Sequence, residues 1–326
     1  MINACAWSYA CLNWSTSPSK RATNMTATAT PSYRPRVMIE CGIAEPRGDS
    51  RCCKYCRGGL SDWPSTMKCL AFAAVVAALV VSALQVPPSQ AAANVLLTAH
   101  RGIGNSATIP ENTIPAFEYA AEHGADIVEF DVRLSSDGKM VVIHDKILNR
   151  TTDCTGYVKD RTLAYIKACD TEPAGSHPPS FRQALTYLKG TDLKIRAELK
   201  GTWTSSQVQK FVNEVKLQGL TSRTIVASFS KTNLTYAKTH APSLQRAYLY
   251  DGPTPTAATI KKYGSIYIPL LANISAAQVS SLKAAGVTVH VRLGDSPEDY
   301  AAMQSISAPV WVVQDVADAG EWLSGN

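Results

Sequence analysis

Beyond residue 93 the sequence has almost no excess of either charge, although the whole chain of 326 residues carries a formal net charge of +6. Nine of the 32 lysines and arginines and four of the 26 acidic residues lie in positions 1–93, which leaves 23 against 22 and a net charge of +1. A nucleic-acid-binding domain needs a clustered surplus of basic side chains. The composition therefore excludes that class, and we expect no nucleic-acid partner.

Cysteine is equally scarce in this part of the chain. Seven of the nine cysteines precede residue 94, so that beyond it there remain Cys154 and Cys169. In an exported protein, an isolated pair that closes a short loop predicts a disulfide, and two free buried thiols are the alternative. Cys52, Cys53 and Cys56 resemble half of a zinc site, but no second half follows them at a usable spacing. We therefore expect one disulfide and no metal site in the N-terminal region.

The sequence also lacks a hydrophobic run long enough to span a bilayer comfortably. Lys68 precedes an apolar stretch of 16 residues, Cys69–Leu84, in which only Ser82 is polar, whereas a spanning helix needs about 20 residues. A lysine, a short apolar core and a small-x-small exit are typical of a secretory signal peptide. We expect residues 67–93 to be that peptide and the protein to be secreted. A membrane anchor formed by the same apolar stretch is the alternative.

Residues 1–66 show no sustained apolar periodicity and are rich in serine, threonine, arginine and cysteine. Signal peptides begin at the initiator methionine, so the signal peptide points to Met67 as the start of the natural chain. We therefore expect residues 1–66 to be an unstructured or spurious extension, and the mature protein to begin near Asn94.

Short β-rich apolar runs alternate with amphipathic stretches between residues 94 and 326. The eight runs are Val95–Ala99, Ile127–Val132, Leu193–Leu199, Thr224–Phe229, Gln245–Tyr250, Ser265–Leu270, Val287–Val291 and Pro309–Val313. Amphipathic stretches between them include residues 113–123, 206–217, 276–285 and 297–303. Eight strand–helix units in about 230 residues predict an α/β fold, a (β/α)8 TIM barrel.

A ninth run, Met140–Ile143, does not fit this alternation. The segment between it and the second strand is too short for a parallel crossover, and it contains Asp137-Gly138, a hairpin turn signal. We expect the run to fold back antiparallel, so that reflection about the turn places His144 opposite Asp131. Residues 146 to about 180 lack barrel periodicity and are expected to form a small insertion after the hairpin.

Polar motifs stand at the ends of the strand-like runs. In chain order they are His100-Arg101-Gly102, Pro110-Glu111-Asn112-Thr113, Glu129-Phe130-Asp131, His144-Asp145 and Glu198-Leu199-Lys200. Residues two apart on a strand share a face, and barrels of this kind have their active sites at the carboxyl ends of the strands. We therefore expect Glu129, Asp131 and Glu198 to converge there, with a cation to offset their repulsion. An all-oxygen site favours Ca²⁺ or Mg²⁺ over zinc.

Each of these motifs alone has an ordinary structural interpretation. A Glu-x-Asp pair is usually a solvated edge or part of a salt bridge, and Pro110–Thr113 suits a helix start with Asn112 or Thr113 as its cap. The functional interpretation depends on their joint occurrence, in order, at strand ends. No comparable polar motif surrounds the other histidines, which are His123, His177, His240 and His290. We expect them to be surface or packing residues.

The motifs resemble the glycerophosphodiester phosphodiesterase family, most strongly from about residue 95 to 200. The resemblance implies hydrolysis of a small-molecule glycerophosphodiester to sn-glycerol 3-phosphate and an alcohol, with Ca²⁺ or Mg²⁺ as cofactor. It also implies an acid–base pair, a metal site and phosphate contacts, formed respectively by His100 and His144, by Glu129, Asp131 and Glu198, and by Arg101 and Lys200.

Two segments depart from the family pattern. Val289–Arg292 stands where many members have Trp-Thr-Val-Asn, and Gln314–Ala317 replaces the usual Thr-Asp-x-Pro. These positions line the substrate side, so the identity of the alcohol stays open while the catalytic set is intact. Trp203 is a candidate for the missing apolar wall of the substrate site, and simple packing under a loop is its alternative.

Two other functions compete with this interpretation. A phospholipase of C or D type, which acts on intact lipids, should carry an exposed apolar or aromatic loop, whereas aromatic residues make up 8% of the chain and the insertion carries mainly charged and small residues. A non-catalytic degenerate barrel would be expected to lose His100 or His144. We therefore expect a phosphodiesterase without stable membrane association once the signal peptide is removed.

Overall fold

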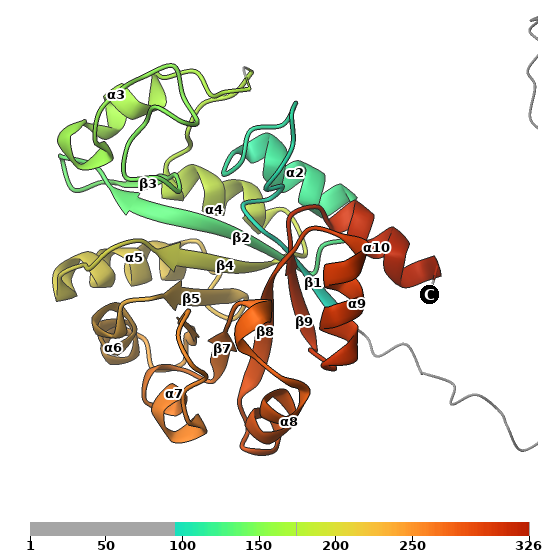
Figure 1. Ribbon diagram of the computed structural model, residues 1–326. Helices are drawn as coiled ribbons and strands as arrows, with labels where there is room; N and C mark the ends of the chain where they lie inside the picture. The colour runs from blue at the N-terminus through green and yellow to red at the C-terminus, as the bar shows by residue number, and fades with distance from the viewer. Residues whose placement is uncertain (1–94, 174, 326) are drawn as a thin grey trace, which may run out of the picture. The chain divides into compact units, whose positions relative to one another are not determined.

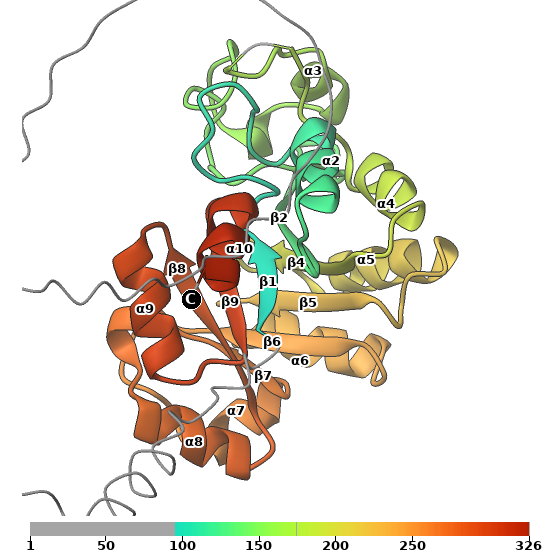
Figure 2. The same cartoon turned by 90° about the vertical axis from the view of Figure 1, so that its right-hand side faces the viewer.

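The computed structural model describes residues 95–173 and 175–325, which form a closed (β/α)8 barrel (Figures 1 and 2). Seven parallel strands follow β1 in the order β2, β4, β5, β6, β7, β8 and β9, and β9 pairs back onto β1. Their bounds are β1 Leu96–Ala99, β2 Ile127–Leu134, β4 Lys194–Leu199, β5 Thr224–Ser228, β6 Gln245–Leu249, β7 Ile266–Ile268, β8 Thr288–Gly294 and β9 Val310–Val313. Each of the eight apolar runs overlaps one of these strands, although β2 and β8 extend past the predicted ends to Leu134 and Gly294, so the predicted barrel is confirmed.

Helices lie around the outside of the barrel (Figure 1). The α-helices are α2 Ile114–Glu122, α3 Leu163–Lys167, α4 Phe181–Lys189, α5 Ser205–Leu217, α6 Lys231–His240, α7 Ala257–Tyr263, α8 Ala276–Ala284, α9 Pro297–Ser305 and α10 Val316–Gly325, and the 3₁₀ helices are η2 Val158–Asp160 and η3 Leu271–Asn273. Each helix from α2 to α9 follows a serine or threonine whose side chain accepts an N–H bond from the first turn. These caps satisfy donors that would otherwise lack partners. The four amphipathic stretches named above correspond to α2, α5, α8 and α9.

A row of buried aromatic rings fixes the outer face of β2. The ring of Phe130 lies 5.3 Å from that of Phe117 on α2 and 6.2 Å from that of Phe181 on α4, measured between centroids. Because successive side chains on a strand point to opposite faces, this packing turns the neighbours of Phe130 inward. Glu129 and Asp131 therefore face the barrel interior, although charged groups there are costly to bury without partners.

β3, Met140–Val142, folds back antiparallel on the end of β2, as the Asp-Gly signal predicted. The predicted register is wrong by one residue. Asp131 lies opposite Ile143, whose N–H donates to the Asp131 carbonyl at 2.9 Å, and not opposite His144. His144 is the next residue along the returning chain, so it still emerges at the same end of the barrel.

The turn itself explains the one-residue difference. Ser135 N–H donates to the Lys139 carbonyl at 2.9 Å, which leaves a loop of Ser136, Asp137 and Gly138 between the bonded pair. Gly138 has a φ of 67°, the left-handed conformation in which a three-residue hairpin loop commonly ends. The centre of the hairpin is thus residue 137, whereas a two-residue Asp-Gly turn would be centred between residues 137 and 138.

Residues 146–180 lie between β3 and α4 and carry η2 and α3 (the upper, green part of Figure 1). They pack through a small apolar cluster of their own, made of Val141, Ile143, Leu148, Val158, Ile166 and Cys169. Because this cluster includes residues of the hairpin, the insertion is held on β3 rather than free in solution.

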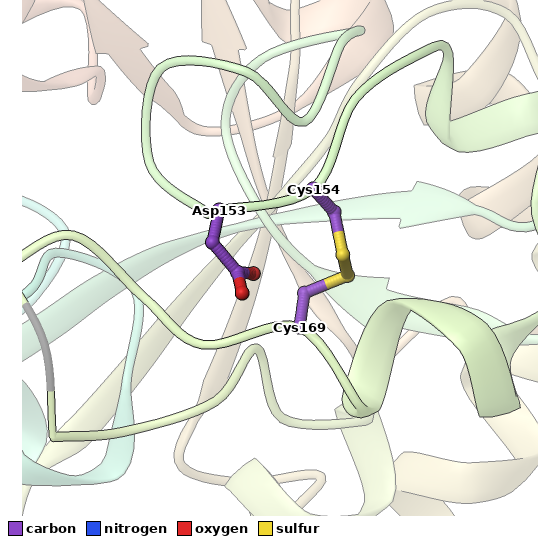
Figure 3. Close-up of side chains that lie close together, drawn as sticks. All are labelled: Asp153, Cys154 and Cys169. Carbon is purple, nitrogen blue, oxygen red and sulfur yellow. A yellow bond between two sulfur atoms is a disulfide. The ribbon is translucent and has the colours of Figure 1, made fainter.

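A disulfide joins Cys154 to Cys169, as predicted, with an S–S distance of 2.13 Å (Figure 3). The Asp153 side chain lies close to the two sulfur atoms. Because each sulfur is bonded to the other, neither is a thiolate that could bind a metal ion together with Asp153.

Three predictions concern residues outside the described part of the chain. They are the extension at 1–66, the signal peptide at 67–93 with its alternative as a membrane anchor, and the mature N-terminus near Asn94. Within residues 95–173 and 175–325, no helix is long and apolar enough to cross a membrane.

We predict that replacing both Cys154 and Cys169 by serine lowers the free energy of unfolding by about 3 kcal/mol, because the crosslink removes loop entropy from the unfolded chain. The bridged residues are 15 apart in the sequence. Urea unfolding of the oxidised protein and of the double variant measures the difference. Two alkylatable thiols in the native protein, or equal unfolding midpoints, would contradict the prediction.

Candidate active site

Three carboxylates converge at the carboxyl ends of β2 and β4. Asp131 is paired with Glu198 across the two strands, and Glu129 lies two residues earlier on β2, so the three side chains share the inner face. Each residue is buried, and one oxygen of each lies within 4.8 Å of the other two. The convergence that strand alternation predicted is therefore present.

Cationic groups offset part of the repulsion between these carboxylates. Lys200 Nζ lies 2.8 Å from Glu198 Oε1 and 3.0 Å from Asp131 Oδ1. Arg101 Nε lies 3.5 Å from Asp131 Oδ2, and the Arg101 backbone N–H donates to Glu129 Oε2 at 3.0 Å. The structure thus places both residues expected to contact phosphate directly against the carboxylate cluster.

The carboxylates have very different electrostatic surroundings. Burial, followed by the charge of Asp131, raises the pKa of Glu129 to about 8. Burial acts in the same direction on Asp131, but the surrounding positive charges, Lys200 foremost, outweigh it and hold the pKa of Asp131 well below its usual range. Two adjacent carboxyl groups whose pKa values are pushed apart in this way need more positive charge before both ionise at neutral pH.

Asn112 orients one of the three carboxylates. Its side-chain amide donates to Asp131 Oδ2 at 2.9 Å, and its side-chain carbonyl accepts the Asp131 N–H at 3.0 Å. Asp131 Oδ1 is buried and accepts no hydrogen bond in the described part of the chain, since Lys200 Nζ is near enough for an ion pair but outside hydrogen-bond geometry. Of the two possible helix caps, Thr113 is the one that caps α2, which leaves Asn112 for this role.

His100 follows β1 and is held by the last strand of the barrel. Its Nδ1 lies 2.6 Å from Gln314 Oε1, and its Nε2 lies 4.0 Å from Glu129 Oε2. A carbonyl oxygen can only accept a hydrogen bond, so Nδ1 carries the proton and Nε2 has the lone pair. Burial, and then the charge of Arg101, lowers the pKa of His100 to about 3. The imidazole is therefore neutral at pH 7.

His144 follows β3 and is oriented by its neighbour in the sequence. Its Nδ1 lies 2.7 Å from Asp145 Oδ1, so the carboxylate fixes the Nδ1–H tautomer and leaves Nε2 free. Burial lowers the pKa of His144, while the charge of Asp131 and the bond to Asp145 act to raise it. His144 is more exposed than His100, with 31% of its side chain accessible against 14%.

A chain of ion pairs links His144 to Arg101 through the insertion. Arg150 Nε lies 2.7 Å from Asp145 Oδ2, and Arg150 Nη2 lies 2.7 Å from Glu111 Oε1. Glu111 Oε1 also accepts from Arg101 Nη1 at 3.0 Å. The insertion therefore contributes Arg150 to the active site. Through Asp145 and Glu111, Arg150 links the side chain of His144, which follows β3, to that of Arg101, which follows β1.

Sequence reasoning missed several of these residues. Arg196 is buried on β4, two residues before Glu198, and burial lowers the pKa of Arg196 while the charges of Glu129 and Glu198 act to raise it. Strand alternation, which aligned Glu198 with Lys200, applies equally to Arg196 and could have found it. Gln314 was identified only as a departure from the family pattern. Its partner His100 is 214 residues away in the sequence and is brought near only when the barrel closes, so no local pattern in the sequence points to the contact.

Trp203 contributes to packing and also lines a cleft next to Lys200. The residue is buried in the main core, its indole N–H donates to the Lys200 carbonyl at 2.9 Å, and it forms part of the cleft wall. The four other histidines match their expected surface or packing roles, since His123, His177 and His240 are exposed or partly exposed and His290 is buried within β8.

Comparison with known proteins identifies the family of this chain. The profile of the glycerophosphoryl diester phosphodiesterase family matches residues 100–318. The chain belongs to this family. It is 34% identical over 220 residues to a glycerophosphodiester phosphodiesterase of Caldanaerobacter subterraneus subsp. tengcongensis, and the match covers 64% of this chain and 89% of that protein.

Solved structures of the family share the fold. A phosphodiesterase from Oleispira antarctica, in complex with the product sn-glycerol-3-phosphate, has a TM-score of 0.64 at 25% identity, covering 70% of this chain and 96% of that chain. A glycerophosphodiester phosphodiesterase from Parabacteroides distasonis has the same TM-score at 22% identity, covering 71% and 98%.

We predict that Asp145→Asn lowers the pKa of His144 further and mixes its two tautomers, because the carboxylate that accepts from Nδ1 and favours the charged ring is lost. NMR titration of the imidazole nitrogens measures both effects. Asp160→Asn, an exposed acidic residue of the same insertion, is the matched control and should leave both unchanged. An unaltered tautomer and pKa in Asp145→Asn would show that Asp145 does not position this ring.

Proposed function

We propose that the protein is a secreted, metal-dependent enzyme that hydrolyses glycerophosphodiesters to sn-glycerol 3-phosphate and an alcohol. One observation carries this proposal: the three buried carboxylates lie beside the imidazoles of His100 and His144. Gln314 fixes the tautomer of His100, and Asp145 fixes that of His144. Membership of the family supports the substrate class, and so does the similarity to a relative named glycerophosphodiester phosphodiesterase.

Glu129, Asp131 and Glu198 fit a hard divalent cation. Their ligand atoms are all carboxylate oxygens, which suit Ca²⁺ or Mg²⁺ and not a soft metal. Asp131 Oδ1 is buried and accepts no hydrogen bond from the described residues, so it is available to bind the cation. Asn112 donates to the other oxygen of the same carboxylate and so holds it in place. When bound, the cation would stabilise negative charge on the phosphate oxygens as a Lewis acid.

The two histidines supply the proton transfers. Because Nδ1 of His100 donates to Gln314, its Nε2 lone pair faces the carboxylate cluster, so we assign His100 the role of the base that takes the proton of the attacking water or hydroxyl group. His144 is more exposed and bonded to Asp145, so it can acquire a proton from solvent and deliver it from Nε2 to the leaving alkoxide. Charge that develops on the phosphorus oxygens is stabilised by Arg101 and Lys200.

Two independent features of the chain support secretion. The apolar run Cys69–Leu84 with its small-residue exit has the composition of a signal peptide. The disulfide between Cys154 and Cys169 belongs to an oxidising compartment. N-terminal sequencing of the exported protein should read a start near Asn94, and a chain that retains residues 67–93 would support the membrane anchor instead.

We predict that a chelator abolishes hydrolysis and that Ca²⁺ or Mg²⁺ restores it, because three buried carboxylates need a cation to bind an anionic phosphate beside them. The assay compares release of sn-glycerol 3-phosphate before chelation, after it and after the ion is returned. Full activity in protein shown to be metal-free by elemental analysis would sink the metal assignment.

We predict that His100→Ala and His144→Ala each lower kcat by about 10²–10⁴-fold, the usual contribution of a positioned acid or base. The double variant should be little worse than the worse single variant, because the two groups act as one unit. His123→Ala, which changes an exposed histidine at the C-terminal end of α2 whose Nδ1 bonds to the Tyr119 carbonyl, is the control. Wild-type turnover in His144→Ala would refute the assigned mechanism.

A further inference from the structure

A cleft of about 420 Å³ opens beside Lys200, between the hairpin, the insertion and the loop after β4. Small-molecule sites typically enclose roughly 300–1,000 Å³, so the cleft can hold a substituent of substrate size. Lys200 lines the cleft and also contacts the carboxylate cluster. A ligand whose phosphate lies at the reaction centre can therefore extend directly into this space.

Every charged residue that lines the cleft is a cation. They are Arg133, Lys146, Lys159 and Lys200, and the lining contains no acidic residue. Lys146 and Lys159 are exposed, and within residues 95–173 and 175–325 neither takes part in an ion pair. Asp145, the acidic residue next to Lys146, is already bound by Arg150 and His144. The cleft therefore has a surplus of positive charge.

Arg133 is fixed with its guanidinium beside the site. Its Nε donates to the His144 carbonyl at 2.7 Å, so this cation is joined to the chain segment that delivers the proposed acid. Two of its nitrogens take no part in that bond and can serve as donors. An anionic group in the cleft would therefore meet the oriented guanidinium of Arg133 and the exposed ammonium groups of Lys146 and Lys159.

The same walls are unsuited to a quaternary ammonium group. Such cations bind over free aromatic faces, and the two aromatic residues of the cleft are Tyr157 and Trp203. The Tyr157 ring is exposed, but the Lys159 ammonium already lies over it, with Nζ 5.8 Å from the ring centroid, and would repel a second cation there. Trp203 is buried, with its indole N–H bonded to Lys200. Neighbouring lysines would also repel a positive ligand.

We propose that this cleft binds the alcohol half of the substrate and selects a head group that carries a further negative charge, either a phosphate or a carboxylate. This inference rests on the proposed function and specifies its substrate class. The phosphodiester lies at the carboxylate cluster, and the additional anion is bound by Lys146, Lys159 and Arg133.

The test compares kcat/KM of the purified enzyme, supplied with its divalent cation, for four substrates. Glycerophosphoinositol and glycerophosphoinositol 4-phosphate differ only in the added phosphate, glycerophosphoglycerate adds a carboxylate without an ammonium group, and glycerophosphocholine adds a cation. We expect the 4-phosphate to be preferred over its parent and glycerophosphocholine to be the poorest substrate. A preference that rests on exposed charges should also shrink at high salt, where the screening length falls to about 3 Å at 1 M.

Substitution of the lysines identifies the site. The double variant Lys146→Gln with Lys159→Gln should lower kcat/KM for the 4-phosphate about tenfold, mainly through KM, since an exposed ion pair contributes up to about fivefold. It should at the same time raise the relative rate with glycerophosphocholine. Lys238→Gln, an exposed lysine on α6 with the same change of charge, is the matched control and should keep the wild-type preference.

The outcomes separate this inference from the proposed function. If the enzyme hydrolyses none of the four substrates, with the cation present, the proposed function fails and this inference fails with it. If it hydrolyses them but prefers glycerophosphocholine, or if the double variant keeps the wild-type preference, the inference is overturned and the proposed function stands. A selective loss with either the phosphate or the carboxylate substrate supports it and shows which anion the cleft recognises.

Discussion

The burial of three carboxylates within a few ångströms of one another is the constraint on which the site depends. Moving a charged carboxylate out of water costs several kcal/mol even after relaxation, and Glu129, Asp131 and Glu198 are held together by the register of β2 and β4. Cationic and hydrogen-bonding groups of the surrounding chain, such as Lys200 and Arg101, offset part of this cost. The loop after β1 even holds Arg101 at a φ of 57° and Asn112 at 60°, left-handed conformations that cost of order 1–3 kcal/mol each.

The same two strands serve stability and chemistry on opposite faces. Outward-facing Phe130 packs against rings on the helices, and this packing keeps its two acidic neighbours pointing inward. The insertion likewise combines a stabilising role with a positioning role at the active site. Its disulfide and small apolar cluster hold the segment that brings Arg150 to Asp145 and Glu111. Anchoring of the insertion and positioning of His144 are therefore linked.

Patterns within single strands and turns of the sequence were enough to predict those parts of the site that depend on one strand alone. The alternation in Glu129-Phe130-Asp131 was enough to align two carboxylates, and the short link before Met140 was enough to predict a hairpin. The register was missed by one residue because Asp-Gly signals a turn without fixing its length. Gln314 and Arg150 could not be predicted in their roles, since their partners depend on barrel closure and on the folding of the insertion.

Calorimetric titration of the chelator-treated protein with Ca²⁺ and with Mg²⁺ tests the central claim most directly, because it measures cation binding without any assay of activity. The account predicts one site per chain, lost in Asp131→Asn and in Glu129→Gln. His100→Ala should retain the wild-type affinity, since His100 lies beside the cluster without contributing a ligand. Absence of binding in the unmodified protein, or equal affinity in Asp131→Asn, would contradict the account.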